Sequence, residues 1–254
     1  MKLEVSNEGD SYQLTAAVLI YTNKQQQHAF ATKHNVEGFA GRPIIRPGTP
    51  FTDKNYATLV KAMAPAEQPR MQWNDPRLLA RGLGRLIWWS PPKKRSLFFK
   101  KSTYNNNTFD GRGVCACPGL VFMVLDRSLY LFGFKGEQAP TQDTKLYQAP
   151  FFNVWSRGEV CVGNANVPRD DQREDLDAWE RMFFGSHFTH PNFAEKDRLT
   201  VGVNPIEFWQ AQLAKPSASF PEKVLYDIQL TVGNLLSVEL QQKLTAFPAA
   251  QGEF

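Results

Sequence analysis

Residues 153–164, with the sequence NVWSRGEVCVGN, place a cysteine directly after a tight turn. Cys161 follows the turn residues Ser-Arg-Gly, and Asn153 stands eight positions before it. A cysteine that is held on a scaffolded loop and reaches solvent can act as a nucleophile. A cysteine between Val160 and Val162 can equally be a small buried hydrophobic residue. The residues by themselves leave both interpretations open.

Two histidines further along the chain are candidates for activating that thiol. His190, in the sequence FTHPN, lies after a predicted helix. It can fold back toward Cys161 and form a Cys-His pair of the kind that activates thiols. His187 lies about one helical turn earlier. A lone histidine near a helix end is more often a surface or capping residue, so this alternative stays open for both.

The other two cysteines, Cys115 and Cys117, form the sequence CAC before a proline. A structural zinc site uses four ligands in spaced pairs, and the sequence has no second Cys or His pair at a suitable spacing. We therefore expect packed residues here, with redox or metal chemistry as the alternative. The sequence also lacks a Gly-rich phosphate loop, a Gly-x-Ser-x-Gly elbow and a His-Glu-x-x-His motif. We expect neither a metal nor a cofactor.

The composition is that of a folded protein. Hydrophobic residues make up 42% of the 254 residues and aromatic residues 13%, enough for a substantial core. No apolar run approaches the ~18 residues of a membrane span, and the start has no signal-peptide pattern, so we expect a cytoplasmic protein. A reducing compartment keeps the three cysteines as thiols, and an odd number leaves at least one unpaired in any case.

The net charge of +4 does not indicate a nucleic-acid-binding protein. The densest basic run is PPKKRSLFFKK, residues 91–101, where three basic residues follow a Pro-Pro pair and two follow an apolar stretch. Nucleic-acid-binding modules usually carry a more continuous basic face. We expect a solvated turn here, with a phosphate-binding patch as the alternative.

The first half of the chain has the pattern of antiparallel strands. Residues 13–34 resemble a hairpin, residues 41–50 form a connector rich in Pro and Gly, and apolar residues over 56–63 recur at helical spacing. Residues 83–100 predict two apolar strands around a Pro-Pro turn, and residues 119–136 predict two more, with a polar loop between the pairs. These four hydrophobic runs indicate an antiparallel meander with helices on at least one face.

Past Cys161 the hydrophobic period becomes helical. It predicts helices over 176–183, after an acidic turn, and over 204–214, with an Asn cap and a Pro at the first helical position. A third helix is predicted over 222–244. Strands followed by helices indicate an α+β fold. We expect an N-terminal extension of a β-hairpin and a helix over residues 1–75, and a main domain over residues 76–246.

The sequence NVWSRGEVCVGN resembles the segment around the active-site cysteine of ubiquitin-conjugating enzymes. In that family the pattern runs His-Pro-Asn, an apolar residue, a short turn with Gly, two residues and then Cys. Five positions match it: Asn153, Val154, Gly158, Val160 and Cys161. The motif has one departure, because Phe151 and Phe152 replace its His and Pro. Two aromatic rings can pack the turn that the histidine mainly holds in that family.

This departure and the sequences LIWWSPPKKRSLFF, CACPGLVF and FFGSHFTHPNF resemble the bacterial branch of the superfamily found in PRTRC systems, prokaryotic family D. The resemblance covers residues 80–195 well and the rest loosely. It implies a ubiquitin-conjugating-enzyme-like α+β domain with an N-terminal β-rich extension. It also implies partners from the same systems: a ubiquitin-like protein, a ThiF-type activating enzyme and a JAB-type metallopeptidase.

The resemblance further implies a role for each site residue. Cys161 accepts the acyl group of a ubiquitin-like C-terminus by transthioesterification. Asn153 donates to the tetrahedral oxyanion or braces the loop. Asp170 and Asp171 orient or desolvate an incoming lysine, although acids at a helix N-terminus are also favoured by the helix dipole.

Two other classes of function stay open beside the thioester carrier. One is a non-catalytic adaptor that keeps the fold and binds the ubiquitin-like protein or the activating enzyme. The other is a partition-associated nucleic-acid-binding factor, suggested by the PRTRC context and the basic run. Salt distinguishes the last class, because binding to phosphates weakens steeply as salt is added.

Overall fold

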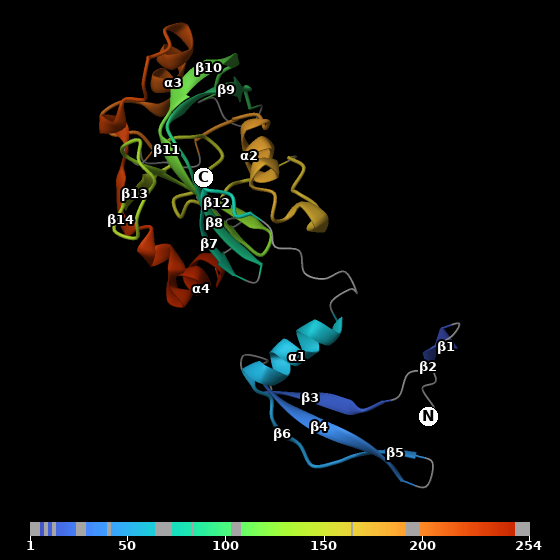
Figure 1. The fold of residues 1–254 in the computed structure, drawn as a ribbon. Coiled ribbons are helices and arrows are strands. Elements are labelled where there is room, and N and C mark those ends of the chain that lie inside the picture. The colour runs from blue at the N-terminus through green and yellow to red at the C-terminus, as the bar shows by residue number, and fades with distance from the viewer. Residues whose placement is uncertain are drawn as a thin grey trace. The chain divides into compact units, whose positions relative to one another are not determined.

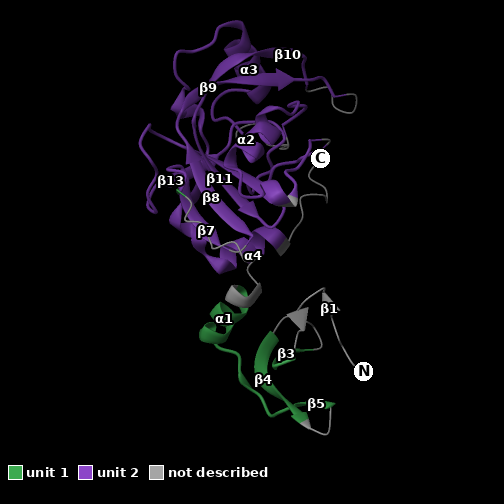
Figure 2. Cartoon of the chain, turned by 45° about the vertical axis from the view of Figure 1, so that its right-hand side comes forward, with its two compact units in different colours: residues 1–73 green, residues 74–254 purple. Residues whose placement is uncertain are grey.

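The computed structural model divides into two compact units, residues 1–73 and residues 74–254, which we describe separately (Figures 1 and 2). The extension expected from the sequence spans residues 1–75. The structure describes residues 6–7, 10–11, 14–23, 29–39, 42–63, 73–82, 84–102, 108–163, 165–191 and 199–246.

Within its described residues, the first unit consists of a two-stranded and a four-stranded antiparallel sheet, followed by a helix. Its elements are β1 (Ser6–Asn7), β2 (Asp10–Ser11), β3 (Ala16–Thr22), β4 (Ala29–Phe39), β5 (Arg42–Ile45), β6 (Thr49–Pro50) and α1 (Asp53–Met63). Strands β3 and β4 pair along their length, which confirms the hairpin predicted over residues 13–34. Strands β5 and β6 also pair with β4.

The second unit is built on a six-stranded antiparallel sheet in the order β14-β13-β12-β11-β8-β7. Its strands are β7 (Leu78–Gly82), β8 (Arg85–Ser90), β11 (Gly119–Leu125), β12 (Ser128–Phe134), β13 (Lys145–Gln148) and β14 (Asp227–Thr231). Two more strands, β9 (Lys93–Phe99) and β10 (Gly111–Cys117), pair with each other. With its helices this unit is α+β, as the sequence predicts.

The Pro-Pro turn predicted within residues 83–100 is wrong, because β8 and β9 do not pair with each other. Strand β8 pairs with β11, and β9 pairs with β10 in a register that sets Lys93 opposite Cys117. Strands β8 and β9 therefore form one arm of a long hairpin, and β10 and β11 form the other. Pro91 and Pro92 interrupt the first arm, and Pro118 interrupts the second at the opposing position. Proline has no N–H to donate to a ladder, so each arm changes sheet there. The chain reverses between β9 and β10, in the polar segment expected to separate two hairpins.

Among its described residues, the second unit also has three α-helices: α2 (Leu176–Phe184), α3 (Pro205–Ala214) and α4 (Val238–Ala246). The first two confirm the helices predicted over 176–183 and 204–214. The Asp175 side chain caps α2 by accepting from the Ala178 amide, and the Asn204 side chain caps α3 in the same way. Among the described residues, no helix has the length and apolar character of a membrane span.

The single helix predicted over residues 222–244 is wrong. A 3-10 turn, η2 (Glu222–Val224), leads into β14, which pairs with β13 at the edge of the sheet. A second turn, η3 (Gly233–Leu236), precedes α4. The β-branched residues around β14 favour a strand. A side chain at Gly233 would crowd the carbonyl oxygen of Gln142. The backbone at Gly233 therefore packs too closely against Gln142 for a continuous helix to pass through this position.

Helices cover both faces of the sheet. Trp88 and Phe122 pack in a cluster with side chains of α2 and α3. Their strand neighbours Ile87 and Val121 point the other way, into a cluster with η3 and α4. Figure 1 shows α2 and α4 on opposite sides of the sheet. Burial on both faces explains why β11 and β12 are hydrophobic throughout, rather than alternating.

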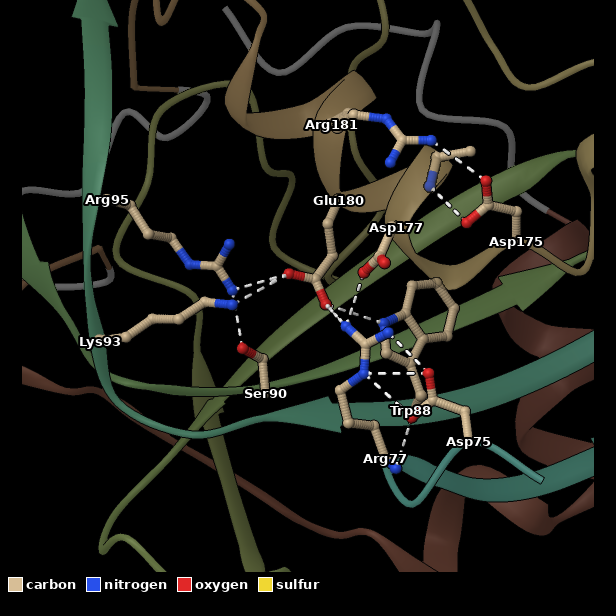
Figure 3. Close-up of polar contacts among 11 residues, drawn as sticks. Asp75, Arg77, Trp88, Ser90, Lys93, Arg95, Asp175, Asp177, Glu180 and Arg181 are labelled. Carbon is tan, nitrogen blue, oxygen red and sulfur yellow. Dashed lines mark hydrogen bonds and ion pairs between the residues drawn. The ribbon is translucent and has the colours of Figure 1, made fainter. Parts of the chain in front are cut away.

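Glu180 of α2 is a buried carboxylate that joins this helix to the sheet region (Figure 3). Its side chain is 7% exposed and accepts hydrogen bonds from Arg95 Nη2 at 2.9 Å, Arg77 Nη1 at 3.2 Å and Trp88 Nε1 at 3.4 Å. Lys93 Nζ lies 3.7 Å away. The turn predicted for the basic run is wrong, because residues 93–95 lie on strand β9. Lys94, Lys100 and Lys101 are exposed, as expected for a solvated segment, whereas the Arg95 side chain is only 9% exposed and, with Lys93, neutralises Glu180.

Candidate functional site

Cys161 stands at the end of a small turn that is closed by short backbone pairing. Val154 and Val160 form an antiparallel bridge. One step further, the Cys161 amide donates to the Asn153 carbonyl oxygen at 2.7 Å. The cysteine side chain is exposed to solvent. The pairing thus fixes the backbone of Cys161 and leaves its thiol free to react.

The same turn is pinned to strand β12 beneath it. The Leu131 amide donates to the Gly158 carbonyl at 2.7 Å, and the Val160 amide donates to the Leu129 carbonyl at 2.8 Å. Gly158 has a φ of 82°, a conformation that glycine adopts readily. A Cβ at this position would collide with the ring of Phe132. The glycine therefore permits the close approach between the turn and the sheet.

The other two cysteines are buried in β10. Cys115 and Cys117 lie in the core cluster beneath α2 and α3, which confirms that they are packed residues. Burial raises the pKa of both thiols, that of Cys117 to about 12. Within the described residues, no group of three or more His, Cys, Asp or Glu side chains is placed to hold a metal ion.

We expect a thiol reagent to modify one cysteine per folded molecule at pH 8. Cys161 is exposed, whereas Cys115 and Cys117 are inaccessible. Cys117 also stays protonated at pH 8, because this pH lies well below its raised pKa. Reaction with a chromogenic disulfide, followed with and without denaturant, measures the number of reactive thiols. Two or more fast-reacting thiols in the folded protein, or one in Cys161→Ser, would contradict this expectation.

Asn153 braces the segment that follows α2. Its side-chain Nδ2 donates to the His187 carbonyl at 2.7 Å, and its Oδ1 accepts from the Thr189 amide at 3.2 Å and the Thr189 hydroxyl at 3.1 Å. Its own amide donates to the His190 carbonyl at 3.3 Å. Asn153 is 8% exposed and has a φ of 63°, which asparagine tolerates better than most residues. This geometry favours the bracing role over donation to an oxyanion.

The two residues before Asn153 anchor the loop in an aromatic core. Phe151 stacks on Trp209 of α3, with ring centroids 5.5 Å apart, and meets Phe183 of α2 edge to face. Phe152 meets Phe99 of β9 edge to face at 5.5 Å. Both phenylalanines are 1% exposed. Aromatic packing against two helices and a strand therefore holds the positions where the related motif has His and Pro.

A pocket of about 1180 Å³ opens beside Cys161 and is rich in basic groups. Its basic lining residues are Lys100, Arg169, Arg181, His187 and His190. None of the described lining residues is an Asp or a Glu. The arginines have acidic partners outside the lining, since Asp171 lies 3.5 Å from Arg169 and Asp175 lies 3.1 Å from Arg181.

His190 shares this pocket with Cys161, but among the described residues no hydrogen bond joins the two side chains. His190 Nδ1 lies 2.9 Å from the Thr189 hydroxyl. Burial lowers the pKa of His190, so its imidazole is neutral near pH 7 and can accept a proton. His187 is exposed and meets Asn153 through its backbone carbonyl. His190 therefore lines the same pocket as Cys161, which is one of the alternatives that the sequence left open.

Asp170 and Asp171 lie in the 3-10 turn η1 (Asp170–Gln172), just before α2. The Asp171 side chain is exposed and pairs with Arg169, and that of Asp170 lies outside the described residues. In this segment the described pocket-lining residues are Arg169 and Gln172. The acceptor-orienting role of the two aspartates stays a prediction.

Residues 55–228 match the family model described as prokaryotic E2 family D. The chain belongs to this family. The match begins within α1, ends within β14 and includes Cys161, Asn153 and His190. No curated protein and no solved structure matches the chain.

Three basic lining residues of this prokaryotic E2-like protein were not predicted from the sequence: Lys100, Arg169 and Arg181. They come from the end of β9, the segment before η1 and the last turn of α2. Backbone pairing brings the first of them to the site, because the Lys100 amide donates to the Phe188 carbonyl at 3.1 Å. Nothing in the local sequence signals this pairing, which joins positions 88 residues apart.

Proposed function

We propose that this E2-like protein carries a ubiquitin-like protein as a thioester on Cys161, and that it is protein B of a PRTRC system. One observation carries the proposal: the backbone of Cys161 is held by hydrogen bonds, while its exposed thiol lines a large pocket. The Cys161 thiolate attacks the thioester between the ubiquitin-like C-terminus and an activating enzyme. A new C–S bond forms, and the thiolate of the activating enzyme leaves.

The neighbouring residues have separate roles in this proposal. Asn153 is a positioning residue, because it holds both the Cys161 amide and the 187–190 segment in place. His190 accepts the proton that an attacking amine releases, since its imidazole is neutral near pH 7. Asp170 and Asp171 orient the acceptor in this proposal. The partners are the ubiquitin-like protein and the ThiF-type activating enzyme of the same system, and its JAB-type metallopeptidase is a further partner.

A gel experiment tests the thioester. The protein is mixed with the activating enzyme, the ubiquitin-like protein and ATP, and the products are separated with and without reductant. An adduct that appears only without reductant supports the carrier. If partners of verified activity give no adduct, the carrier is excluded, and co-purification with the ubiquitin-like protein would then support the adaptor.

The partition-factor alternative has no support from the basic run. Lys93 and Arg95 face the buried Glu180 instead of forming an open phosphate-binding surface.

We expect Asn153→Ala to slow charging of Cys161 by about tenfold or more and to lower the free energy of unfolding by about 2–3 kcal/mol. The change removes three part-buried hydrogen bonds of the side chain, and alanine tolerates a positive φ less well than asparagine does. Single-turnover charging and urea denaturation measure the two effects.

Asn153→Gly is the matched variant, because glycine adopts this φ and lacks the amide. Both variants should lose charging rate if the amide braces the loop. Charging at the normal rate in Asn153→Gly would show that the backbone conformation alone is required.

A further inference from the structure

Lys100 places an amine in the same pocket as the thiol of Cys161. It is the one lysine among the described residues that line this pocket. Its side chain is exposed, and within the described part of the chain it has no ion-pair partner. The next residue, Lys101, is also exposed but does not line the pocket, and its amide binds the Asp110 carboxylate at 2.9 Å.

A short series of backbone contacts fixes where Lys100 lies relative to the cysteine. Its amide donates to the Phe188 carbonyl, at the centre of the 187–190 segment. Asn153 holds that segment from its other side and accepts a hydrogen bond from the Cys161 amide. Two backbone stretches, the 187–190 segment and Asn153, therefore lie between Lys100 and Cys161. Since hydrogen-bonded chains lie about 5 Å apart, these three steps place the two backbones within roughly 15 Å of each other.

Long, flexible groups can cross this distance. The lysine amine stands on a four-carbon stem, and a polypeptide C-terminus bound to Cys161 is itself extended and mobile. The two reacting groups would meet in this open pocket. An amine that is tethered in this way has a high effective concentration compared with one that arrives by diffusion.

A tether also distinguishes Lys100 from a lysine of another protein. Lys100 lines the pocket already, whereas a lysine of another protein must first bind there.

We propose that Lys100 is an acceptor of the acyl group carried by Cys161, so that the protein modifies itself. This inference rests on the proposed thioester function. The neutral amine of Lys100 attacks the thioester carbonyl, an N–C bond forms, and the C–S bond breaks. Cys161 leaves as a thiolate, and the nitrogen loses its extra proton to His190 or to solvent. The product is an isopeptide bond on Lys100 that reductant does not cleave.

The experiment follows both adducts in the full-length protein after charging. A reductant-sensitive band reports the thioester, a reductant-stable band reports self-modification, and peptide mapping locates the modified lysine. Lys100→Arg should form the thioester at the normal rate and lose the stable band by at least about tenfold, because its tethered amine is gone. Lys101→Arg, the matched control, should keep both bands.

A mixture of Lys100→Arg and Cys161→Ala distinguishes transfer within one molecule from transfer between molecules. The first variant is charged but has no Lys100, and the second has Lys100 but is not charged. Transfer within one molecule predicts almost no stable band in this mixture.

Two outcomes would overturn the inference. If the thioester forms and the stable band is absent, or persists in Lys100→Arg, Lys100 is not the acceptor and the carrier function stands. If no thioester forms with active partners, both proposals fail.

Discussion

Replacing Cys161 by alanine is expected to abolish charging with a ubiquitin-like protein. The residue provides the exposed thiol of the site, whereas Cys115 and Cys117 are buried and have raised pKa values. Neither can take over the reaction without unfolding of the core. The free energy of unfolding should change by less than about 0.5 kcal/mol, because the lost side chain is on the surface. Non-reducing gels and urea denaturation measure the two quantities.

Cys161→Ser sharpens this test. A serine hydroxyl at the same position would hold the partner as an oxygen ester, which thiols do not cleave and hydroxide does. We expect slow formation of an adduct that survives reductant and is lost after mild alkali. Charging of Cys161→Ala at the normal rate would show that another residue carries the acyl group.

Replacing Glu180 by alanine is expected to lower the free energy of unfolding of the second unit by about 3–5 kcal/mol, since a buried ion pair loses one partner. Arg95, whose side chain is 9% exposed, would keep a buried charge without its acid. Arg77 and Trp88 would lose one acceptor each. Such a loss is a large part of the usual 5–15 kcal/mol of total stability. Urea denaturation followed by tryptophan fluorescence measures it, because five of the six tryptophans lie in this unit.

Asp177→Ala is the matched control for Glu180→Ala. Asp177 lies on the same helix and binds the same arginine, Arg77, at 2.8 Å, but its side chain is 58% exposed (Figure 3). An exposed ion pair contributes about 0–1 kcal/mol. Equal losses in the two variants would contradict the view that burial makes Glu180 important.

The helices of the second unit were predictable because their signals are local. Asn204 followed by proline marks the start of α3, and the apolar spacing from Leu176 onward marks α2. The helix predicted over 222–244 was wrong because the apolar residues of this segment fit a helix and a strand equally well. Pairing with β13, which lies about 80 residues earlier, decides between the two.

The long hairpin could not be predicted for a related reason. A Pro-Pro pair locally indicates a turn, but two arms that both carry proline at one level can bend together and continue. The partner of each strand is set by contacts across the sheet. Glu180 shows the same limit, because its role depends on Arg95, which lies 85 residues away in the sequence.

The candidate site was predictable in part. The turn before Cys161 needs a glycine, and Gly158 is visible in the sequence. The sequence left open whether His190 lies near the cysteine, and the structure places it in the lining of the same pocket. The interactions of Asn153 with the 187–190 segment and the position of Lys100 could not be deduced, because both depend on how α2 and β9 pack.

The pinning of the cysteine turn to β12 has a consequence for association. The amides of Leu131, Val160 and Cys161 are all bonded within this small region, so they should exchange slowly with deuterated solvent. A loop that is ordered beforehand loses little conformational entropy when a partner docks. Most of the conformational entropy lost on complex formation is then lost by the incoming polypeptide tail. The affinity should therefore depend more on the stiffness of that tail than on any rearrangement of the cysteine turn.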